Sequence, residues 1–178
     1  MKKLAIILAV ALGWASGANA MTLTSPEIKP GGKIADEQVF NGWDCKGGNV
    51  SPELVWTGAP KGTKSFVVTV FDSDAPTGSG FWHWSVANLP AGTTGLPKGA
   101  GDGKGLPEGA LQVRNDYSQI GYGGPCPPPG KPHHYHITVF ALDLDKLPID
   151  ANASPAVVGF FANAHALAKA TLTGLYGK

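Results

Sequence analysis

Three segments of the sequence place ionisable side chains beside turns that contain proline. They read FDSDAP at 71–76, FWHWSVAN at 81–88 and HHYHITVF at 133–140. Alternate side chains of a strand face opposite sides, so His133 and Tyr135 share one face while His134 and His136 share the other. At most one of these two pairs can therefore line any single pocket.

The first segment carries two carboxylates two positions apart at the end of an apolar run. We expect Asp72 and Asp74 to project on the same side of the chain, where they could orient a histidine or bind a cation. The alternative is purely structural, because aspartate favours turns and Pro76 stiffens one.

The second segment carries a histidine between tryptophans. Alternation predicts His83 and Ser85 on one face and Trp82, Trp84 and Val86 on the other. A histidine in this setting is either a ligand-binding residue or a packing residue, and the segment alone does not decide.

Asp72, His83, His133 and Tyr135 all stand at predicted strand ends. Imidazoles and a phenol donate hydrogen bonds to an anion, and a carboxylate fixes the tautomer of its histidine. Asp72, His83 and His133 also match the two-histidine, one-carboxylate set of a metal-dependent enzyme. Sequence spacing does not separate the two hypotheses.

Motifs of common enzyme classes are missing from the sequence. It contains no Gly-x-Ser-x-Gly elbow, no HExxH and no glycine-rich phosphate loop with a lysine. Gly78-Ser79-Gly80 lacks the strand-turn-helix context of a nucleophile elbow. We therefore expect a binding module without catalytic residues or a cofactor, rather than an enzyme.

Short strands must position these side chains, because the chain has 25 glycines, 15 prolines and only short apolar runs. Strands are predicted at 64–72, 81–90 and 134–143, with weaker candidates at 54–60 and 21–28. The segment 88–110 is glycine-rich and has no sustained period, so we expect a functional loop or a mobile excursion there.

One helix is predicted near the C-terminus. Ser154 is a good N-cap, Pro155 suits the first helical position, and 157–170 has apolar residues at three- and four-residue spacing. Residues 171–178 alternate well enough for a terminal strand. The predicted architecture is a single mostly-β domain, an antiparallel sandwich or Greek-key arrangement with one or two peripheral helices.

Residues 1–20 have the pattern of a cleaved secretory signal. Lys2 and Lys3 precede an apolar run from Leu4 to Leu12, and Ala18-Asn19-Ala20 offers small residues for cleavage. The run is too short for a stable membrane anchor, and no later segment has the ~20 apolar residues of a membrane helix. We expect a mature domain of residues 21–178 that is periplasmic or secreted.

The net charge of the mature chain limits the class of partner, and the expected compartment determines the state of the two cysteines. Cleavage would take the formal net charge from +1 to −1 by removing two lysines and no acidic residue, which argues against nucleic acid or an anionic membrane as the main partner. Cys45 and Cys126 would lie in an oxidising compartment, where a disulfide is favoured. A reactive thiol is the alternative.

The motifs, in their order, resemble the phosphatidylethanolamine-binding protein family, above all its bacterial Raf kinase inhibitor-like branch, of which some members are exported. They are GGNVSPELVW (47–56), FDSDAP (71–76), FWHWSVANLP (81–90), RNDYSQIGYGGPCPPPGKPHHY (114–135) and HALAKATLTGLYGK (165–178). The resemblance runs from about Met21 to the C-terminus. Ser73 stands where many members have proline. His134 stands where most have arginine, which makes one positive charge near the pocket rim pH-dependent.

The resemblance implies a β-sandwich whose small pocket takes phosphate-like anions and phospholipid head groups. Carried over by motif, the pocket residues are Asp72, Asp74, Pro76, His83, Pro127, His133 and Tyr135. The proline-rich loop would hold His133 and Tyr135 in place, because proline fixes φ. A homodimer is also implied. A further alternative is an inhibitor or modulator of a partner protein, such as a protease or kinase, that acts through its surface with 88–110 as the contact segment. An exported protein, however, cannot reach a cytosolic kinase.

Overall fold

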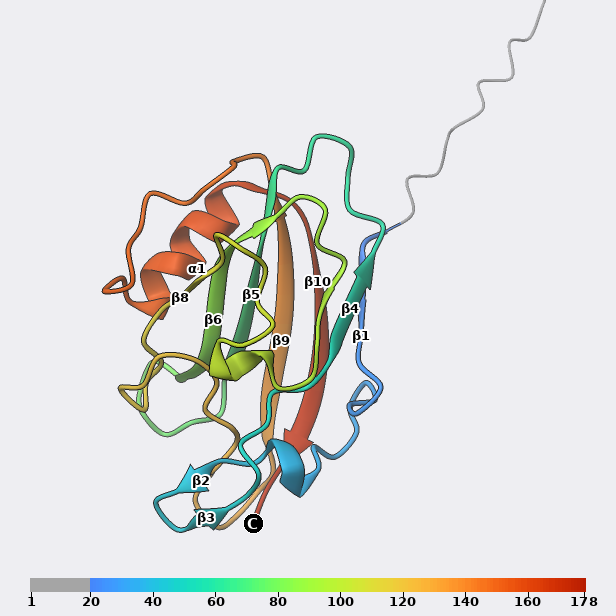
Figure 1. Cartoon of the computed structure of the whole chain (residues 1–178). Coiled ribbons are helices and arrows are strands. Elements are labelled where there is room, and N and C mark those ends of the chain that lie inside the picture. Colours follow the sequence, from blue (N-terminus) through green and yellow to red (C-terminus); the bar gives the residue numbers. More distant parts are fainter. Residues whose placement is uncertain (1–19) are drawn as a thin grey trace, which may run out of the picture.

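The computed structural model describes residues 20–178, which form three antiparallel sheets and one α-helix (Figure 1). The predicted signal peptide lies outside the described residues except for Ala20. The strands are β1 Thr22–Thr24, β2 Asn41–Gly42, β3 Cys45–Lys46, β4 Leu54–Thr57, β5 Ser65–Asp72, β6 Phe81–Pro90, β7 Gly95–Leu96, β8 Leu111–Gln112, β9 His133–Leu142 and β10 Ala166–Tyr176. Within residues 20–178, no helix has the length and apolar character needed to cross a membrane.

The largest sheet has five strands in the order β10-β9-β5-β6-β8. Its three central strands are those that the β-branched and aromatic runs predicted, so these predictions are confirmed. Nearly every residue of β5 is buried, because both faces of the sheet are covered. A strand covered on both faces reads as a nearly continuous apolar run rather than an alternating one, and SFVVTVF is such a run apart from Ser65 and Thr69.

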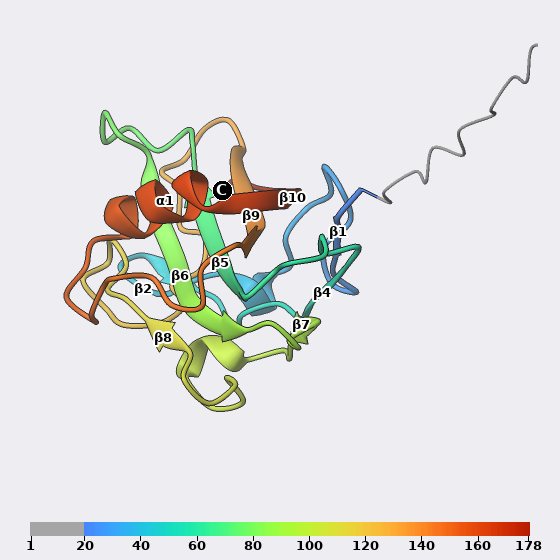
Figure 2. The same ribbon diagram turned by 90° about the horizontal axis from the view of Figure 1, so that it is seen from above.

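The smaller three-stranded sheet, β1-β4-β7, lies along the β9–β10 side of the large sheet (Figures 1 and 2). The two weaker strand candidates are thereby confirmed as β1 and β4. Between the two sheets lies the main core, to which Leu23, Trp56, Val68, Trp84 and Ile137 belong. A second apolar cluster fills the space between the other face of the large sheet and helix α1 (Pro155–Ala164).

The glycine-rich segment 88–110 contains short ordered elements and packs against the core. It contains β7 and a short 3-10 turn at Ala100–Asp102, and Leu96 and Ala100 are fully buried in the main core. Gly99 and Gly103 flank the turn with positive φ, which glycine adopts without a steric cost. The segment lacks a sequence period because it alternates turns with elements of two or three residues, yet its apolar side chains anchor it.

The C-terminal helix is shorter than its pattern predicted. Ser154 caps it as expected, accepting a hydrogen bond from the Val157 backbone N–H, but it ends at Ala164. The predicted continuation to residue 170 is wrong, because β10 begins at Ala166 and pairs with β9 along its length. Backbone pairing with a sheet edge overrides the helix propensity of alanine and lysine there.

The predicted disulfide is confirmed by the bridge between Cys45 and Cys126, whose Cα atoms lie 6.0 Å apart. It joins β3 to the proline-rich loop that precedes β9, across a sequence separation of 81 residues. In the chain-entropy model, closing a loop of this length stabilises the folded state by about 4–5 kcal/mol.

We expect reduction of this disulfide to lower the free energy of unfolding by up to about 4–5 kcal/mol, because the unfolded chain regains its loop entropy. Denaturant unfolding of oxidised and reduced protein measures the difference, and the Cys45→Ser, Cys126→Ser double variant is the control without thiols. Mass spectrometry of unreduced protein should show a Cys45–Cys126 linked peptide. Free alkylation of both thiols in unreduced protein would contradict the bridge.

Candidate functional site

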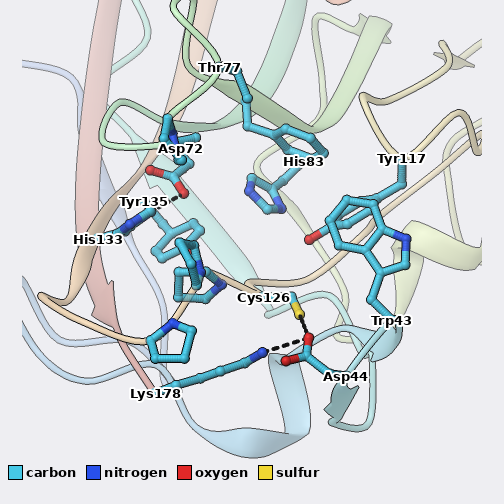
Figure 3. A pocket seen from close by; sticks show the side chains of 16 residues that line it. Trp43, Asp44, Asp72, Thr77, His83, Tyr117, Cys126, His133, Tyr135 and Lys178 are labelled. Atoms are coloured by element: carbon cyan, nitrogen blue, oxygen red, sulfur yellow. Dashed lines mark hydrogen bonds and ion pairs between the residues drawn. The ribbon is translucent and has the colours of Figure 1, made fainter.

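A cavity of about 440 Å³ opens at one end of the five-stranded sheet, where β5 ends and where β6 and β9 begin (Figure 3). Its polar floor consists of Asp72, His83, His133 and Tyr135. Aromatic and proline side chains supply most of the remaining wall, namely Trp43, Phe81, Tyr117, Pro76 and Pro127 to Pro129. Asp44 and Lys178 lie at the mouth.

Six of the seven residues carried over by motif line this cavity, and Asp74 does not. The Asp74 carboxylate instead accepts hydrogen bonds from the backbone N–H and the Nδ1 of His134, both at 2.7 Å. The expectation that Asp72 and Asp74 project together is therefore wrong. The chain turns after β5, and the Asp74 backbone N–H donates to Asp72 Oδ1 at 2.9 Å, as in an Asx turn.

Asp72 and His133 form a buried hydrogen-bonded pair on the cavity floor. His133 Nδ1 lies 2.8 Å from Asp72 Oδ2, and the residues are 8% and 3% exposed. With Asp74 bonded to the other oxygen, both oxygens of the Asp72 carboxylate are engaged by donors. When Nδ1–H donates to this carboxylate, the tautomer of His133 is set and its Nε2 is left for other partners.

A β-bulge positions His83. Val70 pairs with Trp84 and Phe71 pairs with Trp82, so β6 gains one residue at His83 relative to β5. Trp84 therefore packs in the main core, whereas Trp82 packs against Phe71 on the other face at a centroid distance of 4.5 Å. The prediction that Trp82 and Trp84 share a face is wrong, because strict alternation fails at a bulge.

The bulge also separates His83 from Ser85, which were predicted to share a face. His83 lines the cavity with Phe81, while Ser85 pairs with Thr69 further along the sheet and does not line it. His83 is thus a residue of the cavity floor and not only a packing residue.

His83 is held as a neutral imidazole. Its Nδ1 donates to the Gly123 carbonyl at 2.7 Å, and the residue is 2% exposed. Burial lowers its pKa below the ordinary value, an effect that the Gly123 hydrogen bond opposes only in part. Nε2 is consequently an acceptor, and it is a buried atom with no hydrogen-bond partner among the described residues.

Tyr135 completes the floor. Its side chain is fully buried, and burial raises the pKa of the phenol far above the ordinary value, so it stays protonated. The hydroxyl makes no hydrogen bond of ordinary length within residues 20–178, although the Asp72 carboxylate lies near enough to contribute to the raised pKa. Tyr117, on the cavity wall, also has a raised pKa because of burial, and its hydroxyl donates to the Gly124 carbonyl at 2.9 Å.

The other two histidines of the 133–136 cluster lie on the opposite face of β9, as alternation predicted. His134 bonds to Asp74, while His136 lies within hydrogen-bond distance of Ser73 Oγ and Thr173 Oγ1, at 3.1 and 3.0 Å. Neither imidazole lines the cavity. The cluster therefore divides between two faces of one sheet.

Trp43, Asp44, Phe81, Tyr117 and Lys178 line the cavity without having been predicted. Phe81, Tyr117 and Lys178 lie inside the quoted motifs, so a closer inspection of those motifs could have flagged them. Trp43 comes from a segment outside those motifs. Asp44 Oδ1 accepts from Lys178 Nζ at 2.8 Å; its 3.7 Å contact with Cys126 Sγ is not a hydrogen bond, because a disulfide sulfur has no proton.

The floor does not bring its carboxylate and two histidines together as a metal-ligand cluster. Within residues 20–178, the one group of three histidine, cysteine or acidic donor atoms within 4.8 Å of one another is Asp44, Cys45 and Cys126. Its two cysteines are joined in the disulfide. The geometry therefore gives no support to Asp72, His83 and His133 as ligands of one metal ion.

Comparison with known proteins identifies the family. A family model described as phosphatidylethanolamine-binding protein matches residues 24–177. The chain belongs to the phosphatidylethanolamine-binding protein family. Its sequence is 54% identical to Escherichia coli YbcL over 162 residues, covering 89% of this chain and 88% of YbcL. It is 49% identical to Escherichia coli YbhB over 157 residues, covering 88% of this chain and 99% of YbhB.

The fold comparison agrees with the sequence comparison. The crystal structure of Escherichia coli YbcL, described as a new member of the mammalian family, superposes with a TM-score of 0.87 and covers 89% of this chain and 98% of that structure. A Mycobacterium tuberculosis relative, LppC, is named as a lipoprotein; it is 35% identical over 160 residues, covering 88% of this chain and 69% of LppC. The predicted mostly-β fold of this family, with a helix near the C-terminus, is confirmed.

We expect His83 to make the protein less stable in acid. Because its folded-state pKa is below the unfolded value of about 6.5, the unfolded chain takes up a proton more readily as the pH falls through 6.5. The free energy of unfolding should then fall with a slope that approaches 1.4 kcal/mol per pH unit, until the folded-state pKa is reached.

Chemical denaturation between pH 8 and pH 4.5 measures this loss in the unmodified protein and in His83→Gln. All other ionisable groups are shared, so the difference between the two curves isolates His83. If the free energy of unfolding changes with pH equally in both proteins, the folded state does not resist protonation of His83.

Proposed function

We propose that this protein binds a phosphate-like anion in the cavity, either free or as the head group of a phospholipid. The observation that carries the proposal is the convergence of His83 Nε2 and Tyr135 Oη on one cavity floor, both buried and without a protein partner. Buried polar atoms are ordinarily hydrogen-bonded, and an unpaired one costs about 1–3 kcal/mol. A ligand with oxygen donors and acceptors would offer partners to both once the groups that cover them move apart, since neither atom has appreciable accessible surface.

The electrostatics of the floor suit a protonated phosphate group. Tyr135 supplies an O–H donor, whereas neutral His83 supplies an acceptor that can bind the O–H of a phosphate monoanion. The Asp72 carboxylate keeps its negative charge although both of its oxygens accept hydrogen bonds, so it repels a phosphate monoanion less than a dianion. The contact of His133 Nδ1 with Asp72 leaves Nε2 of that imidazole for the ligand.

A binding module explains the cavity better than an enzyme. The aliphatic hydroxyl at the cavity, that of Thr77, donates to the Gly80 carbonyl and not to a histidine. A nucleophile activated by a neighbouring base is thus not formed by the described cavity residues. The names of the bacterial relatives designate no enzymatic activity either.

We expect inorganic phosphate at ten times its dissociation constant to raise the melting temperature by about 3–5 °C, because ligand binding to the folded state adds about 1.4 kcal/mol. His83→Ala and His133→Ala should abolish the rise. The His136→Ala variant should retain the rise, because His136 lies on β9 like His133 but on the opposite face of that strand. Differential scanning calorimetry at constant ionic strength gives the measurement.

Phosphoethanolamine and phosphatidylethanolamine vesicles, tested beside inorganic phosphate, distinguish a head-group ligand from free phosphate. No stabilisation by any of the three would refute the anion site. Hydrolysis of ester, phosphodiester or peptide substrates by metal-free protein, lost in the same histidine variants, would replace the binding module with an enzyme.

We also propose that the protein is exported to the periplasm or secreted after cleavage behind Ala20, as a domain of residues 21–178. The disulfide and the lipoprotein name of LppC support export. Mass spectrometry of protein from the extracytoplasmic fraction should find Met21 as the first residue, and a chain that keeps residues 1–20 in the cytoplasm would contradict this. A protein partner and a homodimer stay predictions.

A further inference from the structure

We propose that Asn152 is a site of N-linked glycosylation, modified by an oligosaccharyltransferase that takes its glycan from a lipid-linked oligosaccharide. The inference rests on the proposed export, because such transferases act outside the cytoplasm. Asn152 lies in the segment between β9 and α1, which Figure 1 shows as an orange loop at the margin of the molecule. None of residues 150–154 lines the cavity, so a glycan there would leave the cavity open.

The sequence around Asn152 carries the acceptor pattern in its extended bacterial form. Residues 150–154 read DANAS and contain the Asn-x-Ser triplet that N-linked transferases recognise. Bacterial transferases of this class also recognise an acidic residue two positions before the asparagine, and Asp150 occupies that position. The residue within the triplet is alanine, not the proline that would exclude it as an acceptor.

The turn that carries Asn152 exposes the acceptor side chain. The Ala153 backbone N–H donates to the Asp150 carbonyl at 3.1 Å, which closes a β-turn with Asn152 at its third position. The Asn152 backbone N–H donates to Asp150 Oδ1 at 2.8 Å, whereas its side-chain amide makes no hydrogen bond within residues 20–178. Asp150, Asn152 and Ser154 are all exposed. A transferase can therefore reach the acceptor without unfolding the domain.

Ser154 supplies the hydroxyl of the triplet just before α1. Its Oγ accepts a hydrogen bond from the Val157 backbone N–H at 3.3 Å, which is a long contact. A serine hydroxyl that accepts in this way still has its own hydrogen to donate. The hydroxyl therefore caps the helix and can also be recognised by an enzyme.

The second Asn-x-Ser triplet of the sequence, Asn49-Val50-Ser51, is closed by the fold. Asn49 Nδ2 donates to the Tyr122 carbonyl at 3.2 Å, and Asn49 Oδ1 accepts from the Gly124 backbone N–H at 2.8 Å. Ser51 is 1% exposed, and its Oγ already accepts a backbone hydrogen bond. No acidic residue stands two positions before Asn49. The tertiary structure thus separates two triplets that look alike in the sequence.

A glycan at Asn152 would also shield the exposed apolar face of α1. The helix sequence, PAVVGFFANA, contains no charged residue, and Val157 and Phe160 are 41% and 69% exposed. Exposed apolar surface of this kind favours association with other chains. A glycan attached two residues before the N-cap would lie beside the first turns of the helix and add polar bulk there.

The transfer reaction forms one bond and breaks one. Asn152 Nδ2 bonds to the anomeric carbon of the first sugar, and the bond from that carbon to the lipid-linked diphosphate breaks. The amide proton leaves with the diphosphate, and no oxidant or reductant takes part. The modified chain is therefore heavier by one glycan.

Intact-mass measurement tests the proposal on the full chain, expressed in a bacterium that contains an oligosaccharyltransferase and a lipid-linked oligosaccharide of known mass. We expect protein from the extracytoplasmic fraction to carry one glycan, which peptide mapping places on Asn152. Asn152→Gln and Ser154→Ala should carry none, whereas Ser154→Thr should keep it. Asp150→Asn, which retains an oxygen for the turn, should lose most of it. Asn163→Gln is the matched control and should keep it, because Asn163 is an exposed asparagine outside both triplets.

An exported chain that has lost residues 1–20 but carries no glycan, in cells that glycosylate a reference acceptor protein, would overturn the inference while export stands. A glycan at Asn49, or full occupancy in Asp150→Asn, would also overturn it, because the exposed acidic turn would then not select the site. If the chain stays in the cytoplasm with residues 1–20 attached, the proposed export fails and this inference fails with it.

Discussion

The antiparallel pairing of β5 with β9 positions the polar floor of the cavity, because it sets Asp72 directly opposite Tyr135 at the end of both strands. His133 then lies one diagonal step away, close enough for its Nδ1 to reach the Asp72 carboxylate at 2.8 Å. A slip of one residue would turn Tyr135 and His133 to the opposite face and bring His134 and His136 inward. The apolar residues of both strands prevent such a slip, since it would expose the core.

Burial then determines the protonation states of His83 and Tyr135 on the cavity floor. Asp72, His83 and Tyr135 are each at most 3% exposed, so water does not satisfy or screen them. The same burial keeps His83 neutral and Tyr135 protonated, which turns two ionisable side chains into one fixed acceptor and one fixed donor. In the proposed anion site, such preorganisation would select a ligand by the placement of its protons as well as by its charge.

The outer wall depends on links between distant parts of the chain. The β2–β3 hairpin, the proline-rich loop and the C-terminal residue meet at the mouth through the Cys45–Cys126 bridge and the Asp44–Lys178 ion pair. These segments have little regular structure of their own. Their order therefore comes from proline, from one covalent bond and from the rings of Phe40 and Tyr117, which stack with centroids 4.0 Å apart.

The sequence by itself determined the central strands, the helix start at Ser154, the pairing of the two cysteines and the division of residues 133–136 between two faces. These features follow from local propensity, capping, compartment chemistry and strict alternation. Only the tertiary structure decided that His83 sits at a bulge, that Asp74 turns away and that β10 replaces the end of the predicted helix. It also brought Trp43 and Lys178 to the cavity. The physical reason is that bulges, sheet pairing and loop contacts arise between residues far apart in the chain, and no local pattern encodes them.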